Sequence, residues 1–187
     1  MQAVAETVRG RGLGGKVFTV GRVLLAAGLW AAAGLMIMQA SAVRSAEAGL
    51  AAWLARLYIP GQAASAGDVI LAGLGTRSPV DLQVGPECTV AILVVPMLVV
   101  AGIASLFGRF SLRGILAGLA VGLGMDIVTN QVRIGLITWA TSRYGGIGYE
   151  ITHKLFGSLI AMLGFTAAFI LMVRIFTRRP ARPRGHP

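Results

Sequence analysis

The sequence has few charged residues and almost no cysteine, and each shortage excludes a class of protein. Charged residues make up 13% of the 187 residues, whereas a soluble domain carries about 25%. Hydrophobic residues make up 56% of the chain, and the mean hydropathy is +0.76. One cysteine, Cys88, excludes an intrachain disulfide. The sequence holds no metal-ligand cluster, phosphate loop or nucleotide-binding fingerprint, so we expect no cofactor and no metal ion.

Long apolar runs indicate that the solvent of this chain is lipid. A helix needs about 20 apolar residues to cross a bilayer. We therefore predict an all-α polytopic membrane protein with about four transmembrane helices, an interfacial helix and an external loop. The predicted crossings are residues 20–43, 89–107, 114–133 and 155–175.

The segments between these runs predict the remaining parts. Leu50, Trp53, Leu54 and Leu57 share one helical face, which predicts an interfacial helix within residues 46–57. Turn residues with sparse charges predict an ordered external loop over 61–86. Residues 134–142 are too few to cross a membrane, so we read them as an interfacial or re-entrant continuation of the third helix. Gly114, Gly118 and Gly122, four residues apart, predict a face for close helix packing.

The length predicts a single membrane domain covering residues 1–187. Within it, 1–19 is a cytoplasmic N-terminal segment, 20–175 is the transmembrane core and 176–187 is a basic cytoplasmic tail. A signal peptide is the competing interpretation of the first run, with Ala40 to Ala42 as its cleavage site. We favour a retained helix because Val23 to Met38 exceeds the about 7–15 residues of a signal-peptide core.

The net charge of +10 is concentrated at the two ends of the chain. Basic residues beside apolar runs mark the cytoplasmic side and suit a lipid bilayer, so we do not expect nucleic acid as a partner. We predict a multi-pass protein of the cell membrane with both termini cytoplasmic. The terminal basic residues are Arg9, Arg11, Lys16 and Arg22 at the start and Arg174, Arg178, Arg179, Arg182 and Arg184 at the end.

In this topology Cys88, Arg133 and His153 come from three helices and lie at one depth, on the outer face. A thiol at a helix N-terminus is a candidate nucleophile because the helix dipole stabilises the thiolate. A guanidinium can hold an oxyanion, and an imidazole can transfer protons near neutral pH. Taken singly, each residue has an ordinary structural role open to it: a small apolar filler, an interfacial anchor and an interfacial histidine.

Two further polar residues lie on the third apolar run. Asn130 is one turn before Arg133 and is expected to orient it. Asp126 is one turn deeper and is expected either to pair with Arg133 or to stay protonated. We assign both a supporting role at the candidate site.

The stretch Glu87-Cys88-Thr89, then Asn130-Gln131-Val132-Arg133-Ile134, then His153 followed by Gly157, resembles the exosortase/archaeosortase family over residues 85–175. The resemblance implies a membrane cysteine transpeptidase or peptidase with an extracytoplasmic active site. It implies Cys88 as nucleophile, Arg133 as stabiliser of the intermediate and His153 as acid and base. Its expected partners are exported proteins with a C-terminal tail of a short motif, a hydrophobic helix and a basic cluster.

Two other functions stay open on the sequence. A non-enzymatic scaffold or partner subunit would use the glycine face to bind another protein, and Cys88 would be incidental. A channel or transporter fragment would use Asp126 and Arg133 as pathway charges. An enzyme must lose activity on Cys88→Ser, whereas a scaffold tolerates that change and a transporter depends on Asp126.

Overall fold

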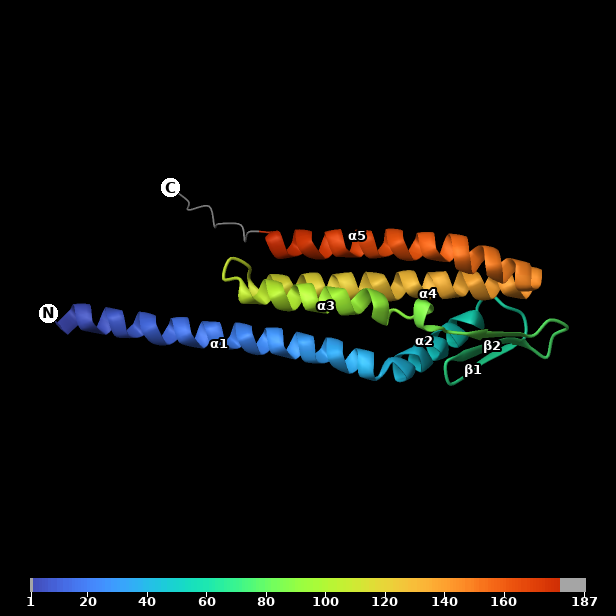
Figure 1. The fold of residues 1–187 in the computed structure, drawn as a ribbon, viewed down its shortest axis with the longest axis horizontal. Coiled ribbons are helices and arrows are strands. Elements are labelled where there is room, and N and C mark those ends of the chain that lie inside the picture. Colours follow the sequence, from blue (N-terminus) through green and yellow to red (C-terminus); the bar gives the residue numbers. More distant parts are fainter. Residues whose placement is uncertain (1, 179–187) are drawn as a thin grey trace.

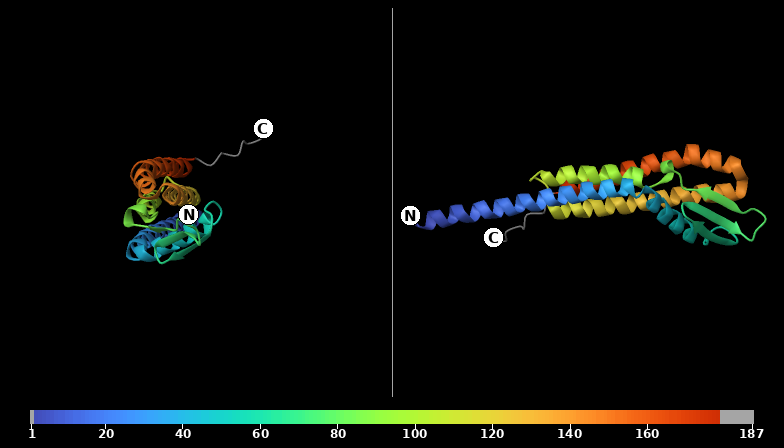
Figure 2. Two further views of the ribbon diagram at one scale, coloured as in Figure 1. Left: turned by 90° about the vertical axis from the view of Figure 1, so that its right-hand side faces the viewer. Right: turned by 60° about the horizontal axis from the view of Figure 1, so that its bottom comes forward.

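The computed structural model describes the backbone of residues 2–178 and the side chains of residues 19–178. Four helices run side by side along the long axis of the molecule (Figure 1). They are α1 (Gln2–Met38), α3 (Ala91–Leu106), α4 (Leu112–Ile151) and α5 (Ser158–Thr177). A smaller layer of one helix and a sheet covers one end of this helical body, as both views of Figure 2 also show. It consists of α2 (Ala40–Ala55), β1 (Gln62–Ala66), β2 (Val69–Leu74) and β3 (Val80–Gln83).

The sheet overturns the prediction of an all-α fold. Its strands are antiparallel in the order β1-β2-β3, and they occupy the predicted external loop, 61–86. Gly67 adopts a positive φ of 60° in the two-residue turn between β1 and β2, a conformation that favours glycine. The central strand β2 is rich in apolar residues, and Ile70 and Ala72 are fully buried. The segment Val69–Leu74 forms a strand because pairing with β1 and β3 and contact with α2 bury its apolar side chains, which a solvated loop would expose.

The prediction of four membrane crossings is also wrong. Among the described residues, two helical segments are long and apolar enough to cross a membrane, Thr19–Met38 and Leu112–Thr177. The predicted crossing at 89–107 fails on length: α3 begins only at Ala91 and has 16 residues, fewer than the about 20 that a crossing needs. The first predicted crossing, 20–43, is interrupted because α1 ends at Met38.

The predicted crossings at 114–133 and 155–175 fall within the single helical segment Leu112–Thr177. The residues 134–142 between them continue α4 as ordinary helix and form no separate interfacial or re-entrant element. The chain direction reverses at Gly145, which has a φ of 61° inside α4, and α5 returns beside α4 (Figure 1). A π-helix, η2 (Thr152–Gly157), joins the last residue of α4, Ile151, to α5.

Glycines on α4 allow α5 to approach closely, which confirms the predicted packing face. A Cβ atom on Gly118 would lie 2.7 Å from Cδ1 of Phe176 and 2.8 Å from the carbonyl oxygen of Met172. A Cβ atom on Gly122 would collide with the methyl group of Met97. Met97 and Met172 are fully buried in the core between the helices. The absent side chains therefore let α3, α4 and α5 share one apolar core.

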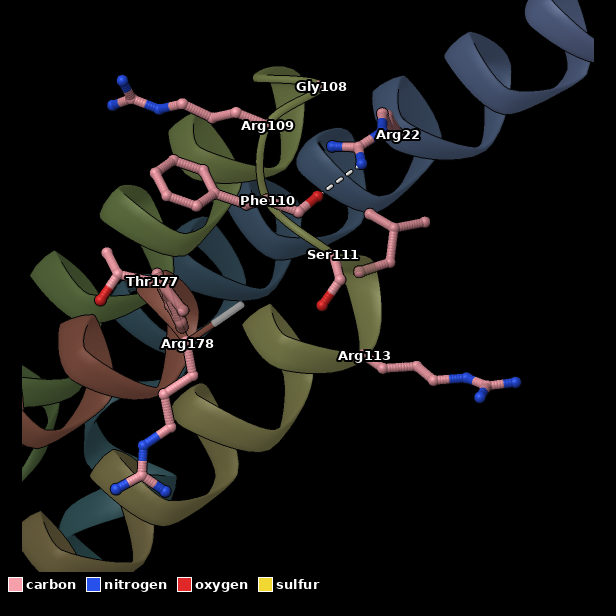
Figure 3. Close-up of a pocket in the computed structure, with 10 residues that line it drawn as sticks. Arg22, Gly108, Arg109, Phe110, Ser111, Arg113, Thr177 and Arg178 are labelled. Atoms are coloured by element: carbon pink, nitrogen blue, oxygen red, sulfur yellow. Dashed lines mark hydrogen bonds between the residues drawn. The ribbon is translucent and has the colours of Figure 1, made fainter. Parts of the chain in front are cut away.

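Arg22 fastens α1 to the loop between α3 and α4 at the end of the body opposite the sheet. Its Nη1 donates to the carbonyl oxygens of Ser105 and Phe107, each at 2.8 Å, and its Nη2 donates to that of Phe110 at 2.6 Å. Figure 3 shows the last of these bonds in a pocket of about 750 Å³. Arg22 is 4% exposed, so the guanidinium satisfies carbonyl groups that a helix-to-helix loop leaves without partners.

We expect Arg22→Met to destabilise the protein by about 2–3 kcal/mol, because carbonyl oxygens beside the bundle would lose a charged donor. Thermal unfolding in detergent micelles measures the effect. Arg113→Met is the matched control, since Arg113 lines the same pocket but is exposed, and it should change stability by less than about 0.5 kcal/mol. Equal stability of the two variants would contradict this account of Arg22.

Candidate active site

Cys88 lies at the end of a short turn that follows the last strand. Pro86 starts the 3-10 turn η1 (Pro86–Cys88), and its restricted φ suits this position. The Cys88 N–H donates to the Gly85 carbonyl at 2.9 Å. Thr89 is extended and α3 begins at Ala91, so Cys88 precedes the helix instead of lying in its first turn. The side chain is 6% exposed and belongs to the apolar cluster beneath the sheet.

His153 lies next to the thiol although 65 residues separate the two in the sequence. The distance from Cys88 Sγ to His153 Nε2 is 3.0 Å, which is within the reach that proton transfer needs. His153 belongs to the π-helix η2, a rare element that often marks functional sites. The Tyr149 ring stacks on the imidazole with a centroid distance of 5.0 Å and an interplanar angle of 13°, and this contact restricts the orientation of the ring.

Arg133 comes from α4 and lies between the cysteine turn and the π-helix. Its Nη1 donates to the Glu87 carbonyl oxygen at 3.1 Å, and the side chain is 6% exposed. A Cβ atom on Gly157 would lie 3.1 Å from Arg133 Nε, so glycine at this position leaves room for the guanidinium. Three residues predicted from the sequence thus lie together, and their catalytic roles stay predictions.

The two predicted supporting residues behave differently. Asn130 is buried and donates from Nδ2 to the Cys88 carbonyl oxygen at 3.0 Å and to Glu47 Oε1 at 2.7 Å. Its hydrogen bonds therefore hold the cysteine turn and do not orient Arg133 as expected. Asp126 is fully buried, and neither carboxyl oxygen has a hydrogen-bond partner among the described residues. The expected pairing of Asp126 with Arg133 is not formed.

Burial raises the pKa of the Cys88 thiol above its ordinary value. The positive charge of Arg133 lowers this pKa, whereas the negative charges of Glu87 and Glu47 raise it. The expected position of the thiol at a helix N-terminus is not found, because Cys88 precedes α3, and Glu47 Oε1 accepts the Val90 N–H there at 2.7 Å. The net effect disfavours the thiolate, and the imidazole of His153 at 3.0 Å is within reach of the thiol proton.

Glu87, Cys88 and His153 also form a set of side chains that could hold a metal ion. Their ligand atoms lie within 4.8 Å of one another, and Glu87 Oε1 is 4.0 Å from His153 Nε2. The guanidinium of Arg133 hydrogen-bonds to the Glu87 carbonyl oxygen of the turn that carries these ligands. Its positive charge would repel a bound cation. This charge favours thiol chemistry over metal binding at the site.

Reasoning from the sequence missed two residues of this site, Tyr149 and Glu47, and Glu47 makes the larger number of contacts there. Leu50, Trp53 and Leu57, on the predicted apolar face of the 46–57 helix, are exposed. The opposite face of α2 is buried, and it consists of Glu47, Ala48, Ala51, Ala52 and Ala55. The available signal was the position of a carboxylate on the same helical stripe as four alanines.

No known protein family, curated protein or solved structure matches this chain. The chemistry of the site is therefore inferred from the geometry and the types of its residues.

We predict that Glu87→Gln speeds the alkylation of Cys88 by iodoacetamide at pH 8 and that Arg133→Gln slows it, each by about 3–10-fold. Loss of the negative charge lowers the pKa of Cys88, and loss of the positive charge raises it, so the thiolate fraction rises or falls accordingly. Mass spectrometry of the quenched protein over a pH series gives the rates. Asp81→Asn, a neutralised carboxylate on β3, is the control and should leave the rate unchanged. A faster rate in Arg133→Gln would disprove this electrostatic account.

Proposed function

We propose that this protein is a membrane-bound cysteine transpeptidase or peptidase of the exosortase type. The observation that carries the proposal is the 3.0 Å contact between Cys88 Sγ and His153 Nε2, made beside a buried arginine. A nucleophile, a base within hydrogen-bond reach and a cation for the developing oxyanion are the groups that acyl transfer requires.

The reaction begins when His153 takes the thiol proton and Cys88 Sγ attacks the scissile carbonyl carbon of the substrate. The carbonyl oxygen becomes an oxyanion, which the Arg133 guanidinium stabilises. The intermediate collapses by breaking the C–N bond, and His153 returns the proton to the leaving amine. A thioester on Cys88 remains. An acceptor amine then resolves it by transfer, or water resolves it by hydrolysis, and either regenerates the thiol.

The distribution of charge and apolar surface supports a location in the cell membrane. Large apolar side chains are exposed along the helical body, among them Leu24, Val128 and Leu163, and such surface is stable in lipid. Arg109, Arg113 and Arg178 extend outward around one end of the body (Figure 3). Basic residues favour the cytoplasmic side, so the opposite end, with the sheet and Cys88, would be extracytoplasmic.

An apolar groove supports a substrate with a hydrophobic helix. The groove has a volume of about 640 Å³ and lies between α2 and α4, where Leu54, Val132 and Trp139 line it. One lining residue, Ala51, also packs in the apolar cluster that contains Cys88. The expected substrate is an exported protein with a C-terminal tail of a motif, an apolar helix and a basic cluster.

The test is co-expression with a tagged exported protein that carries such a tail and comes from the same genome. We expect the wild-type protein to remove the tail and Cys88→Ser to remove none. His153→Ala should slow cleavage by at least about 100-fold, and Arg133→Lys by about 100–1,000-fold, because lysine lacks the planar fork of donors. The intact mass of the product separates transfer to an amine from hydrolysis.

His186→Ala is the matched control for His153→Ala, since it removes the other histidine of the chain and should not change cleavage. Equal processing by wild type and Cys88→Ser would exclude the thiol from the reaction and favour the scaffold function. Dependence of a transport activity on Asp126, with tolerance of Cys88→Ser, would instead support the transporter.

A further inference from the structure

A carboxylate lies in the interior beside the candidate site without contacting the reacting atoms. Glu47 is 7% exposed and lies on the buried alanine face of α2. Burying a carboxylate is costly unless hydrogen bonds compensate for the lost water. The other buried residues of this face are alanines, so packing alone does not require a carboxylate at this position. Its role is therefore indicated by its hydrogen bonds.

Three donors from two other helical regions converge on Glu47. Oε1 accepts from the Val90 N–H and from Asn130 Nδ2, each at 2.7 Å. Oε2 accepts from the Thr89 hydroxyl at 2.6 Å. Val90 and Thr89 lead into α3 and Asn130 belongs to α4, so one carboxylate joins α2, α3 and α4.

These contacts surround the main chain of Cys88. Thr89 and Val90 are the two residues that follow the cysteine, and Asn130 Nδ2 donates to the Cys88 carbonyl oxygen at 3.0 Å. The turn that carries the thiol is therefore fixed on its C-terminal side by Glu47 and through Asn130. A displacement of about 1 Å at a nucleophile can reduce a rate about 100-fold, so such supporting contacts decide whether the thiol meets its base.

We propose that Glu47 is a positioning residue, whose carboxylate holds the Cys88 turn and the start of α3 so that the thiol faces His153. The inference rests on the proposed function, since it concerns the same thiol and base. Glu47 does not touch the substrate, and it acts through the main chain of Cys88 and through Asn130.

Two variants separate the hydrogen bonds of Glu47 from its charge. Glu47→Gln keeps the contacts, because the amide oxygen can accept from Val90 and Asn130 while the amide nitrogen donates to the Thr89 hydroxyl oxygen. Glu47→Ala removes all of them. Asp68→Asn is the matched control, since Asp68 pairs with Arg44 in the same layer and is not one of the charges that shift the pKa of the Cys88 thiol.

The first measurement is the alkylation rate of Cys88, which needs no substrate and so does not depend on the proposed function. We expect Glu47→Ala to slow alkylation at least about 10-fold, because the thiol loses its alignment with the base, and Glu47→Gln to stay within about 3-fold of wild type. Tail cleavage should follow the same order, with the loss in kcat and little change in KM. Failure of the wild-type protein to cleave, with this order of alkylation rates intact, would overturn the proposed function alone.

The pH profile of alkylation measures the charge of Glu47 separately from its hydrogen bonds. The negative charge of Glu47 raises the pKa of the Cys88 thiol, so Glu47→Gln should shift the midpoint to lower pH while Asp68→Asn leaves it in place. The other groups that face the thiol are unchanged in these variants; they are Arg133, Glu87, Tyr149 and His153.

Wild-type alkylation and cleavage rates in Glu47→Ala would overturn the positioning role. Equal losses in Glu47→Gln and Glu47→Ala would overturn it as well, because charge and not hydrogen bonding would then be the property that matters. If Glu47→Ala does not fold, as judged by thermal unfolding, Thr89→Val replaces it. That change removes one donor to the carboxylate; slower alkylation would support the proposal, and an unchanged rate would refute it.

Discussion

Close packing of α4 against the returning chain brings Arg133 and His153 to the same end of the molecule. Gly118 leaves space that the Phe176 ring fills, and Gly157 leaves space for Arg133. The chain reverses direction at Gly145 and returns beside α4. His153 on the returning segment therefore lies near Arg133 of α4. A Cβ atom at either position would lie within 3.1 Å of the facing segment, so each glycine permits the observed close approach.

Buried polar groups at the sheet end of the molecule are held by one another. Glu47, Asn130 and Arg133 are each more than nine-tenths buried, and their donors and acceptors meet around the turn of Cys88. In a medium of low dielectric constant such bonds are strong and their loss is costly, so these bonds restrain the main chain on both sides of the thiol. Because burial keeps the pKa of Cys88 raised, the proposed reaction relies on the adjacent imidazole and not on a preformed thiolate.

The molecule divides into two ends with different chemistry (Figure 1). At one end, arginines surround the loop between α3 and α4, and Arg22 fastens that loop to α1. At the other end, α2 and the sheet cover the turn that carries Cys88. In the proposed orientation the first end meets anionic lipid headgroups, and the second end receives exported substrate proteins.

Much of this arrangement could be predicted from the sequence, because hydropathy and charge act locally. The apolar runs predicted helices, the glycines of α4 predicted close packing, and Cys88, Arg133 and His153 were selected by the residue types that thiol chemistry requires. Composition could not predict the sheet at 62–83, since Gln62–Ala66 is alanine-rich and becomes a strand only by pairing with β2. Hydropathy alone also predicted too many membrane crossings, because the apolar run at 89–107 includes residues that precede α3 and are not helical.

What the sequence by itself determined is the kind of side chain available at the site; only the tertiary structure decided which side chains touch. The Cys88 contact with His153 spans 65 residues, and the Glu47 contact with Asn130 spans 83. Such contacts depend on the crossing angles of whole helices, on their positions along the long axis and on which faces they bury. The packing of many side chains together sets these quantities. Glu47 shares one face of α2 with four alanines, a pattern visible in the sequence, but only the tertiary structure showed that this face is buried.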